Sequence, residues 1–226
     1  MFDAVIFDCD GVLVDSEVLA IKGEREALSD IGLEYTPEEF VQRFIGLHDT
    51  AFFAQLRKDY RIKFEADPGP DFEDNILAGR RKHKDGIMPI DGAAMALDET
   101  RSLIGAIGVA SSSRSDFLHQ KLTRCNLIER AAPHVYSADL VDNGKPAPDI
   151  FLYTADRLGV DPSRCLVLED SINGVKAAVS AGMQVWAFEG GGHIFPSYTR
   201  TLVETGATRI AKDFSDFVGL LRSSVG

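Results

Sequence analysis

The chain opens on a short apolar run that ends in two carboxylates one residue apart, and this feature constrains the fold more than any other. Residues 4–7 read AVIF, which is typical of a buried strand, and Asp8, Cys9, Asp10 and Gly11 follow. A buried carboxylate is costly unless it is paired or bound to a metal. Because residues i and i+2 of an extended chain point the same way, Asp8 and Asp10 should face one polar site. Cys9 points to the opposite side and is interpreted as a core residue.

Hydrophobic spacing divides the rest of the chain into two parts. Residues 16–88 carry apolar residues at helical spacing, which predicts an all-helical segment. From residue 89 onward, short apolar runs alternate with helical stretches, which predicts a parallel sheet covered by helices on both faces. The predicted fold class is therefore α/β, a doubly wound parallel sheet with a Rossmann-like core. Residues 1–15 and 89–226 would form this core, and residues 16–88 an all-α insertion after its first strand.

Charge and composition exclude several classes of partner. The formal net charge of -11 argues against a nucleic-acid surface, which needs a basic stripe. No apolar run approaches the ~20 residues of a membrane span, so no membrane partner is expected. The three cysteines are widely spaced and lack metal-ligand spacing, which favours a reducing cytoplasm. We expect a monomer or a weak homodimer.

Polar residues gather at the ends of the predicted strands, where open parallel sheets bind their ligands. These residues are Asp8, Asp10, Ser111, Ser112, Ser113, Lys145, Glu169 and Asp170. Several carboxylates beside one ammonium group suit Mg²⁺, which prefers carboxylates, waters and a phosphate as ligands. A phosphate group would then bridge the metal, Lys145 and Ser111.

The spacing of the first two carboxylates suggests separate roles. Asp8, nearer the strand, could bind the metal and attack as a nucleophile, since a carboxylate can form an aspartyl-phosphate. Asp10, one position further out, could give a proton to the leaving oxygen and later take one from water.

Four segments resemble the four motifs of the haloacid-dehalogenase-like hydrolases, in the family's order: DCDGVLVDS, ASSS, GKPAPD and LEDSINGVKAAVSAGM. The resemblance is closest to the phosphoglucomutase-like branch of small-molecule phosphatases and implies that residues 16–88 are a helical cap domain. It implies Asp8 as nucleophile and metal ligand, and Asp10 as acid/base with its backbone carbonyl on the metal. It also implies Asp170 as a metal ligand, with Glu169 beside it.

The resemblance further implies that Ser111 binds the phosphoryl group and that Lys145 neutralises charge on the nucleophile and the phosphate. Ser112 is a further phosphate-binding candidate, although Ser112 and Ser113 also fit an N-cap for the following helix. Ser171 is interpreted as the N-cap of the next helix. We interpret His193, in the segment FEGGGHIFP, as structural.

The expected function is a Mg²⁺-dependent phosphatase acting on a small phosphorylated metabolite, such as a sugar or sugar-acid phosphate. A phosphosugar mutase on the same scaffold is the nearest alternative. A dehalogenase would use the same nucleophile without a metal. Asp10 and Asp170 argue against this alternative, because without a cation the clustered carboxylates would only repel one another. A phospho-accepting signalling module shares the clustered aspartates, yet has no use for a long helical insertion.

The insertion should set specificity. Arg43, His48 and Asp49, around the segment FIGLHDT, are candidates for contact with the leaving group. The mutases of this branch carry a Thr and a His just after the first motif, where this sequence has Ser16 and Ala20. Asp49 would repel a second phosphate, which favours phosphatase over mutase. The basic run at residues 80–84 is interpreted as a solvated helix face, and Trp186 as core.

Overall fold

The computed structural model describes residues 1–45, 47 and 49–225, without the side chain of residue 225. Within these residues the strands form one six-stranded sheet in the order β3-β2-β1-β4-β5-β6. The strands are β1 (Ala4–Phe7), β2 (Ala106–Ser111), β3 (Val135–Ser137), β4 (Cys165–Glu169), β5 (Gln184–Phe188) and β6 (Arg209–Ala211). All neighbouring strands are parallel. This is the strand order of a doubly wound sheet, so the predicted fold class is confirmed.

Strand β1 lies at the centre of the sheet because its four residues are all apolar. Each is fully buried. Phe7 is in register with Val109 of β2 on one side and with Leu168 of β4 on the other. The next residue of each strand therefore emerges at the same edge, which brings Asp8 beside Glu169.

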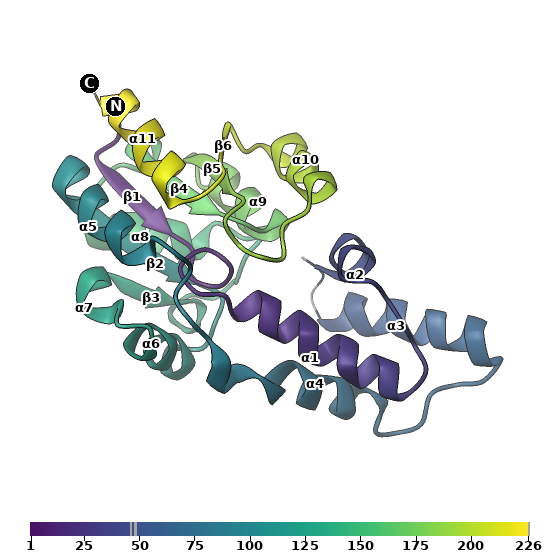
Figure 1. The fold of residues 1–226 in the computed structure, drawn as a ribbon. Coiled ribbons are helices and arrows are strands. Elements are labelled where there is room, and N and C mark those ends of the chain that lie inside the picture. The colour runs from purple at the N-terminus through teal and green to yellow at the C-terminus, as the bar shows by residue number, and fades with distance from the viewer. Residues whose placement is uncertain (46, 48, 226) are drawn as a thin grey trace. The chain divides into compact units, whose positions relative to one another are not determined.

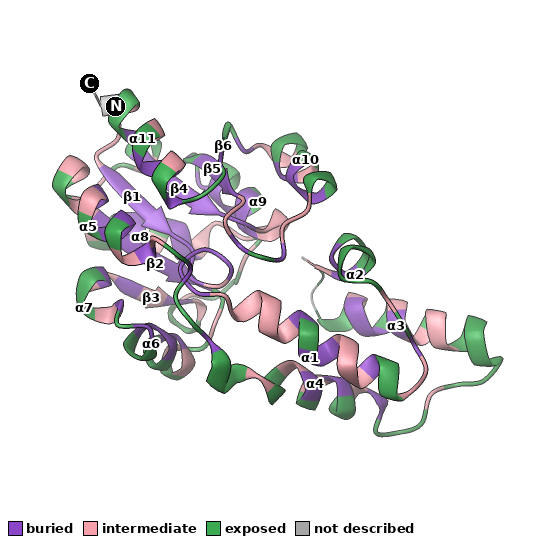
Figure 2. Cartoon of the chain, viewed as in Figure 1, coloured by how far each residue is buried: buried purple, intermediate pink, exposed green. Residues whose placement is uncertain are grey.

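Two layers of helices cover the sheet (Figure 1). Helices α5 (Ala93–Ile104) and α11 (Phe214–Val225) pack on each other in one layer, and α8 (Asp149–Leu158) and α9 (Ile172–Ser180) do so in the other. Phe7 meets Phe217 of α11 edge to face, with ring centroids 5.6 Å apart. Trp186 and Cys9 are buried, which confirms both as core residues. Figure 2 shows the buried strands between helices whose outer faces are exposed.

Three more helices complete this part: α6 (Ser115–Arg124), the short α7 (Ile128–Ala131) and α10 (Pro196–Thr205). Short 3₁₀ turns at Ala138–Leu140 and Pro162–Arg164 lead out of β3 and into β4. Among the residues that the structure describes, no helix is both long and apolar enough to cross a membrane.

The chain separates into two compact units. One comprises Met1–Asp15 with the chain from Ile87 onward, and the other is Ser16–Gly86. The second unit is helical and contains α1 (Ser16–Asp30), α2 (Pro37–Phe44), α3 (Asp49–Phe64), α4 (Phe72–Lys82) and a 3₁₀ turn at Lys84–Gly86.

The helical unit has an aromatic core and one very close helix pair. Helix α2 begins with a capping box between Thr36 and Glu39. Its Phe44 packs against Phe52 of α3 with ring centroids 5.5 Å apart. Helices α1 and α4 approach at Gly23 and Gly79, where a Cβ on Gly23 would lie 2.0 Å from the carbonyl oxygen of Gly79. Only residues without side chains allow this approach.

In the α/β unit, the segment just before the insertion pairs with the segment just after it. Val14 and Pro89 form an antiparallel bridge. The N–H of Ile90 donates to the carbonyl of Leu13 at 3.0 Å. The Asp15 side chain accepts the N–H of Met88 at 2.7 Å. These contacts join the two segments at which the insertion begins and ends.

Candidate active site

Asp8 is fixed at the edge of the sheet by the pairing of its own backbone. Its N–H donates to the carbonyl of Leu168 at 3.0 Å, and the residue is only 6% exposed. The Lys145 ammonium group donates to Asp8 Oδ1 at 2.5 Å, to Glu169 Oε1 at 2.8 Å and to the carbonyl of Ala110 at 3.0 Å. All three of its protons therefore have acceptors, and Lys145 bridges two buried carboxylates.

Burial and charge act in opposite directions on this pair. Burial raises the pKa of Asp8 well above its usual value, the Lys145 charge opposes that shift, and the neighbouring carboxylates add to it. Burial by itself lowers the pKa of Lys145, but Asp8 and Glu169 outweigh burial, so the net pKa is raised. Lys145 is therefore a permanent positive charge beside the Asp8 carboxylate.

Three carboxylates form a group that could hold a metal ion. Asp8, Glu169 and Asp170 are all buried, and one oxygen from each lies within 4.8 Å of the others. Lys145 contacts two of these groups, Asp8 and Glu169, and a bound cation would offset the mutual repulsion of all three. Carboxylate oxygens are hard ligands of the kind that Mg²⁺ prefers. The residues therefore fit a divalent cation.

The sequence after β4 holds Glu169 in one orientation. Its Oε2 accepts hydrogen bonds from the N–H of Asp170 at 2.8 Å and from the N–H and hydroxyl of Ser171 at 2.8 and 2.9 Å. A Cβ on Gly174 would lie 1.6 Å from Glu169 Oε1, so only glycine leaves room for this carboxylate. Ser171 also accepts the N–H of Gly174 at 3.0 Å, which confirms it as the N-cap of α9.

A buried lysine that the sequence analysis did not identify holds Asp10. Lys121 of α6 is 1% exposed and forms an ion pair with Asp10 Oδ1. It also donates to the Ser113 hydroxyl at 2.8 Å. Asp10 Oδ2 accepts hydrogen bonds from the Ser113 hydroxyl at 2.7 Å and from Ser111 at 3.2 Å. Burial lowers the pKa of Lys121, but Asp10 leads the opposing effects and the net pKa is raised.

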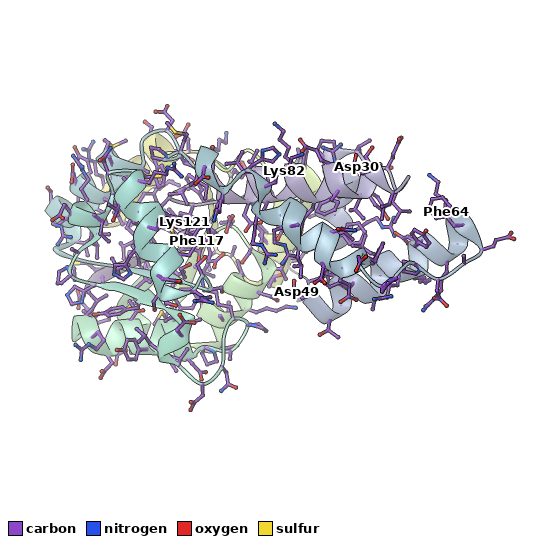
Figure 3. The ribbon with its side chains drawn as sticks, turned by 90° about the horizontal axis from the view of Figure 1, so that it is seen from below. Asp30, Asp49, Phe64, Lys82, Phe117 and Lys121 are labelled. Atoms are coloured by element: carbon purple, nitrogen blue, oxygen red, sulfur yellow. The ribbon has the colours of Figure 1, made fainter. Side chains whose placement is uncertain are left out.

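One sequence signal could have identified Lys121. The buried residues of α6 are Leu118, Lys121 and Leu122, which is helical spacing on one face. A lysine on the apolar face of a helix needs a buried acidic partner. Lys121 lies beside Phe117 of the same helix (Figure 3). Its ammonium nitrogen is 4.8 Å from the centroid of the Phe117 ring.

Ser112 and Ser113 do not have the N-cap role predicted for them. The N-cap of α6 is Arg114, without a side-chain cap, so the N-cap interpretation of Ser112 and Ser113 is wrong. Ser113 is turned instead toward Asp10, while Ser112 is exposed. Ser111 is buried and its hydroxyl accepts the N–H of Ser113 at 3.0 Å. Phosphate binding by Ser111 and Ser112 stays a prediction.

The candidates in the helical unit form ion pairs within that unit. Arg43 contacts Asp59 at 2.5 Å, and Asp49 contacts Arg80 at 2.8 Å. His48 lies outside the described residues. Arg80 also pairs with the buried Glu24, so the interpretation of residues 80–84 as a solvated face is wrong at its first position.

Comparison with known proteins gives the class to which this fold and site belong. Residues 5–188 match the family model of haloacid dehalogenase-like hydrolases. The chain therefore belongs to this hydrolase family, which confirms the resemblance carried by its four motifs.

Two curated relatives illustrate the range of the family. The chain is 34% identical over 183 residues to the chloroplastic protein SUPPRESSOR OF QUENCHING 1 of Arabidopsis thaliana, but the match spans 80% of this chain and only 17% of that protein. It is 32% identical over 183 residues to the phosphorylated carbohydrates phosphatase of Thermotoga maritima, covering 80% of this chain and 82% of the relative.

Solved structures resemble the whole chain. A haloacid dehalogenase-like protein of unknown function from Agrobacterium tumefaciens is 33% identical, with a TM-score of 0.88 and full coverage of both chains. A hydrolase of the same family from Deinococcus radiodurans, crystallised with bound phosphate and sodium, is 31% identical with a TM-score of 0.85. That comparison covers 99% of this chain and 97% of the other.

Proposed function

We propose that this protein is a Mg²⁺-dependent phosphatase that hydrolyses a small phosphorylated metabolite, a sugar or sugar-acid phosphate, through an aspartyl-phosphate on Asp8. One observation carries the proposal: Asp8 is buried within a group of three carboxylates, and Lys145 contacts it at 2.5 Å. The Thermotoga maritima relative, named as a phosphatase of phosphorylated carbohydrates, supports the substrate class. The phosphate in the Deinococcus radiodurans structure supports a phosphoryl ligand.

The proposed reaction has two halves. An Asp8 oxygen attacks phosphorus while the bond to the leaving oxygen breaks, and Asp10 gives that oxygen a proton. Asp10 then takes a proton from water, whose oxygen attacks the aspartyl-phosphate and releases inorganic phosphate and the Asp8 carboxylate. Asp8, Glu169 and Asp170 would hold Mg²⁺, which supplies positive charge to the phosphoryl oxygens.

Lys121, Ser111 and Ser113 hold the Asp10 carboxylate in one orientation, since together they contact both of its oxygens. The Lys121 ammonium group stays beside Asp10 in both halves of the proposed reaction. Lys145 keeps Asp8 in place and offsets its charge as the anionic substrate approaches. These contacts supply the fixed charges that phosphoryl transfer needs.

We assign substrate choice to the helical unit, with Arg43 and Asp49 as its candidate residues. Replacing Asp49 with Asn should change KM for sugar phosphates and leave kcat for a small aryl phosphate within about twofold. An Asp49→Asn variant with the same relative rates across a substrate panel would remove Asp49 from this role.

The test of the proposed function is phosphate release from an aryl phosphate and from a panel of sugar and sugar-acid monophosphates. We expect release with Mg²⁺, none with EDTA, and recovery when Mg²⁺ is restored. Full phosphate release in EDTA would contradict the Mg²⁺ dependence of the proposal. Conversion of a hexose 1-phosphate into its 6-phosphate without inorganic phosphate, followed by phosphorus NMR, would establish a mutase instead.

A further inference from the structure

The loop after β5 contacts the carboxylate group, although the proposed reaction assigns it no role. Its sequence from Glu189 to Phe195 is EGGGHIF. At its start, the Glu189 N–H donates to the carbonyl of Ala211 at 2.8 Å, and the Glu189 carboxylate accepts the Thr199 hydroxyl at 2.6 Å. Within it, the N–H of Ile194 donates to the carbonyl of Gly191 at 3.1 Å. These bonds give the loop a defined conformation.

His193 of this loop contacts Asp170. Its Nε2 lies 3.0 Å from Asp170 Oδ2, and the two side chains are 2% and 3% exposed. Because a carboxylate oxygen accepts hydrogen bonds, we assign the imidazole proton to Nε2, whose N–H donates a hydrogen bond to Asp170 Oδ2. This bond limits rotation of the Asp170 carboxylate about its Cβ–Cγ bond.

Two glycines make space for the imidazole ring. A Cβ on Gly11, whose φ is +78°, would lie 1.8 Å from Asp170 Oδ2 and 2.6 Å from His193 Cε1. A Cβ on Gly191 would lie 2.6 Å from the carbonyl oxygen of Gly11 and 2.8 Å from His193 Cε1. The turn after β1 and the loop after β5 therefore both pack against the His193–Asp170 pair, and neither tolerates a side chain there.

We propose that His193 is a positioning residue for Asp170 and sets the affinity of the site for its divalent cation. The proposal rests on the proposed function only in taking Mg²⁺ as that cation. Carboxylates that bind metals are commonly held by hydrogen bonds from outer partners, and loss of such a partner costs 10–100-fold in metal affinity. Within the described residues, the group with metal-ligand spacing consists of Asp8, Glu169 and Asp170, without His193. The imidazole therefore acts through Asp170.

Three substitutions separate the hydrogen bond from the space that the ring fills. His193→Leu removes the donor and retains apolar volume. His193→Gln can place an amide N–H near the position of Nε2, whereas the shorter His193→Asn ends before it. His119→Leu is the matched control, since His119 is exposed on α6 and its ring nitrogen contacts the carbonyl of Ser115.

The measurement is binding of Mn²⁺ alone, followed by electron paramagnetic resonance and then displaced by Mg²⁺, in the full chain without substrate. We expect His193→Leu and His193→Asn to weaken binding about 10–100-fold, His193→Gln to recover part of the loss, and His119→Leu to bind like the unmodified protein. In steady-state assays, the Mg²⁺ concentration for half-maximal rate should rise by the same factor. At saturating Mg²⁺, kcat of the Gln variant should return to within about twofold of the unmodified enzyme.

Equal affinities in the Gln and Asn variants would overturn the proposal, as would binding by His193→Leu within twofold of the unmodified protein. If the Leu variant does not fold, the comparison of the Gln and Asn variants still tests whether the hydrogen bond to Asp170 sets the cation affinity. Failure of the proposed function would look different: the unmodified protein would bind Mn²⁺ with this dependence on His193 but release no phosphate from any monoester. Absence of cation binding in the unmodified protein would overturn the inference. Phosphate release in EDTA would then show whether the protein is a phosphatase without a metal.

Discussion

At the scale of single residues, Asp8 carries the proposed chemistry. Replacing Asp8 with Asn removes the attacking carboxylate oxygen and preserves side-chain size, so turnover should fall far more than tenfold, the equivalent of about 1.4 kcal/mol. Steady-state phosphate release with Mg²⁺ is the measurement, and circular dichroism checks the fold. A variant that retains more than about a tenth of the activity would show that Asp8 is not the nucleophile.

Lys121 is the second residue whose replacement is informative. Lys121→Met keeps the volume on the buried face of α6 but leaves Asp10 without its cation. We expect kcat to fall about 10- to 100-fold, less than the 10²–10⁴-fold that a positioned acid or base supplies. Lys176→Met, at an exposed position of α9, is the control and should leave kcat unchanged. Unchanged kcat in the Lys121 variant would mean that the ion pair has no part in the reaction.

The sequence predicts the site residues that lie in or directly after strands, because strand ends of a parallel sheet meet at one edge. Asp8, Glu169 and Asp170 follow this rule, and they form the described group with metal-ligand spacing. Lys121 and His193 do not follow it. Lys121 meets Asp10 across 111 positions of the chain, and His193 reaches Asp170 from a loop. Such contacts depend on how helices and loops pack, which local periodicity does not encode.

At the scale of elements, the contact of α1 with α4 in the helical unit depends on glycine. Gly23→Ala would place a Cβ 2.0 Å from the Gly79 carbonyl oxygen, so one backbone must move. Overpacking of this kind costs about 1–3 kcal/mol, which exceeds the ~0.5–1 kcal/mol that alanine gains over glycine within a helix. We expect a net loss of stability, measured by denaturant unfolding.

Gly219→Ala is the control for Gly23→Ala. Gly219 is an exposed position of α11, and nothing lies within 4 Å of an added Cβ. Here only the helix-propensity gain applies, and stability should rise by about 0.5–1 kcal/mol. Equal effects of the two substitutions would contradict the assigned role of the Gly23–Gly79 contact.

The elements themselves differ in how well the sequence predicts them. The strands follow from short apolar runs, and β4 is fully buried as its sequence CLVLE requires for a central parallel strand. Helix α5 gives a weaker signal in the sequence. Only four of the twelve residues of α5 are buried, Ala93, Ala96, Leu97 and Thr100, and two of these are alanines. Small and polar residues on the buried face weaken the periodic signal that identifies an amphipathic helix.

At the scale of the whole molecule, charge is distributed in a way that links metal binding to stability. The chain has a formal net charge of -11, and three buried carboxyl groups lie close together in the α/β unit, where Lys145 pairs with two of them, Asp8 and Glu169. A cation bound there neutralises part of this charge only in the folded state. Because unfolding separates the three carboxylates, Mg²⁺ should stabilise the folded protein by mass action.

We therefore expect Mg²⁺ at about 100 times its dissociation constant to stabilise the protein by ~2.7 kcal/mol, which corresponds to a rise in Tm of about 5–10 °C for a chain of this size. Thermal unfolding in Mg²⁺ and in NaCl of equal ionic strength measures the effect, and Asp170→Asn should reduce it. If the two units unfold in separate transitions, the rise belongs to the α/β unit, because the acidic group found among the described residues lies there. An equal rise in NaCl would show that the stabilisation comes from screening of the net charge rather than from a bound cation.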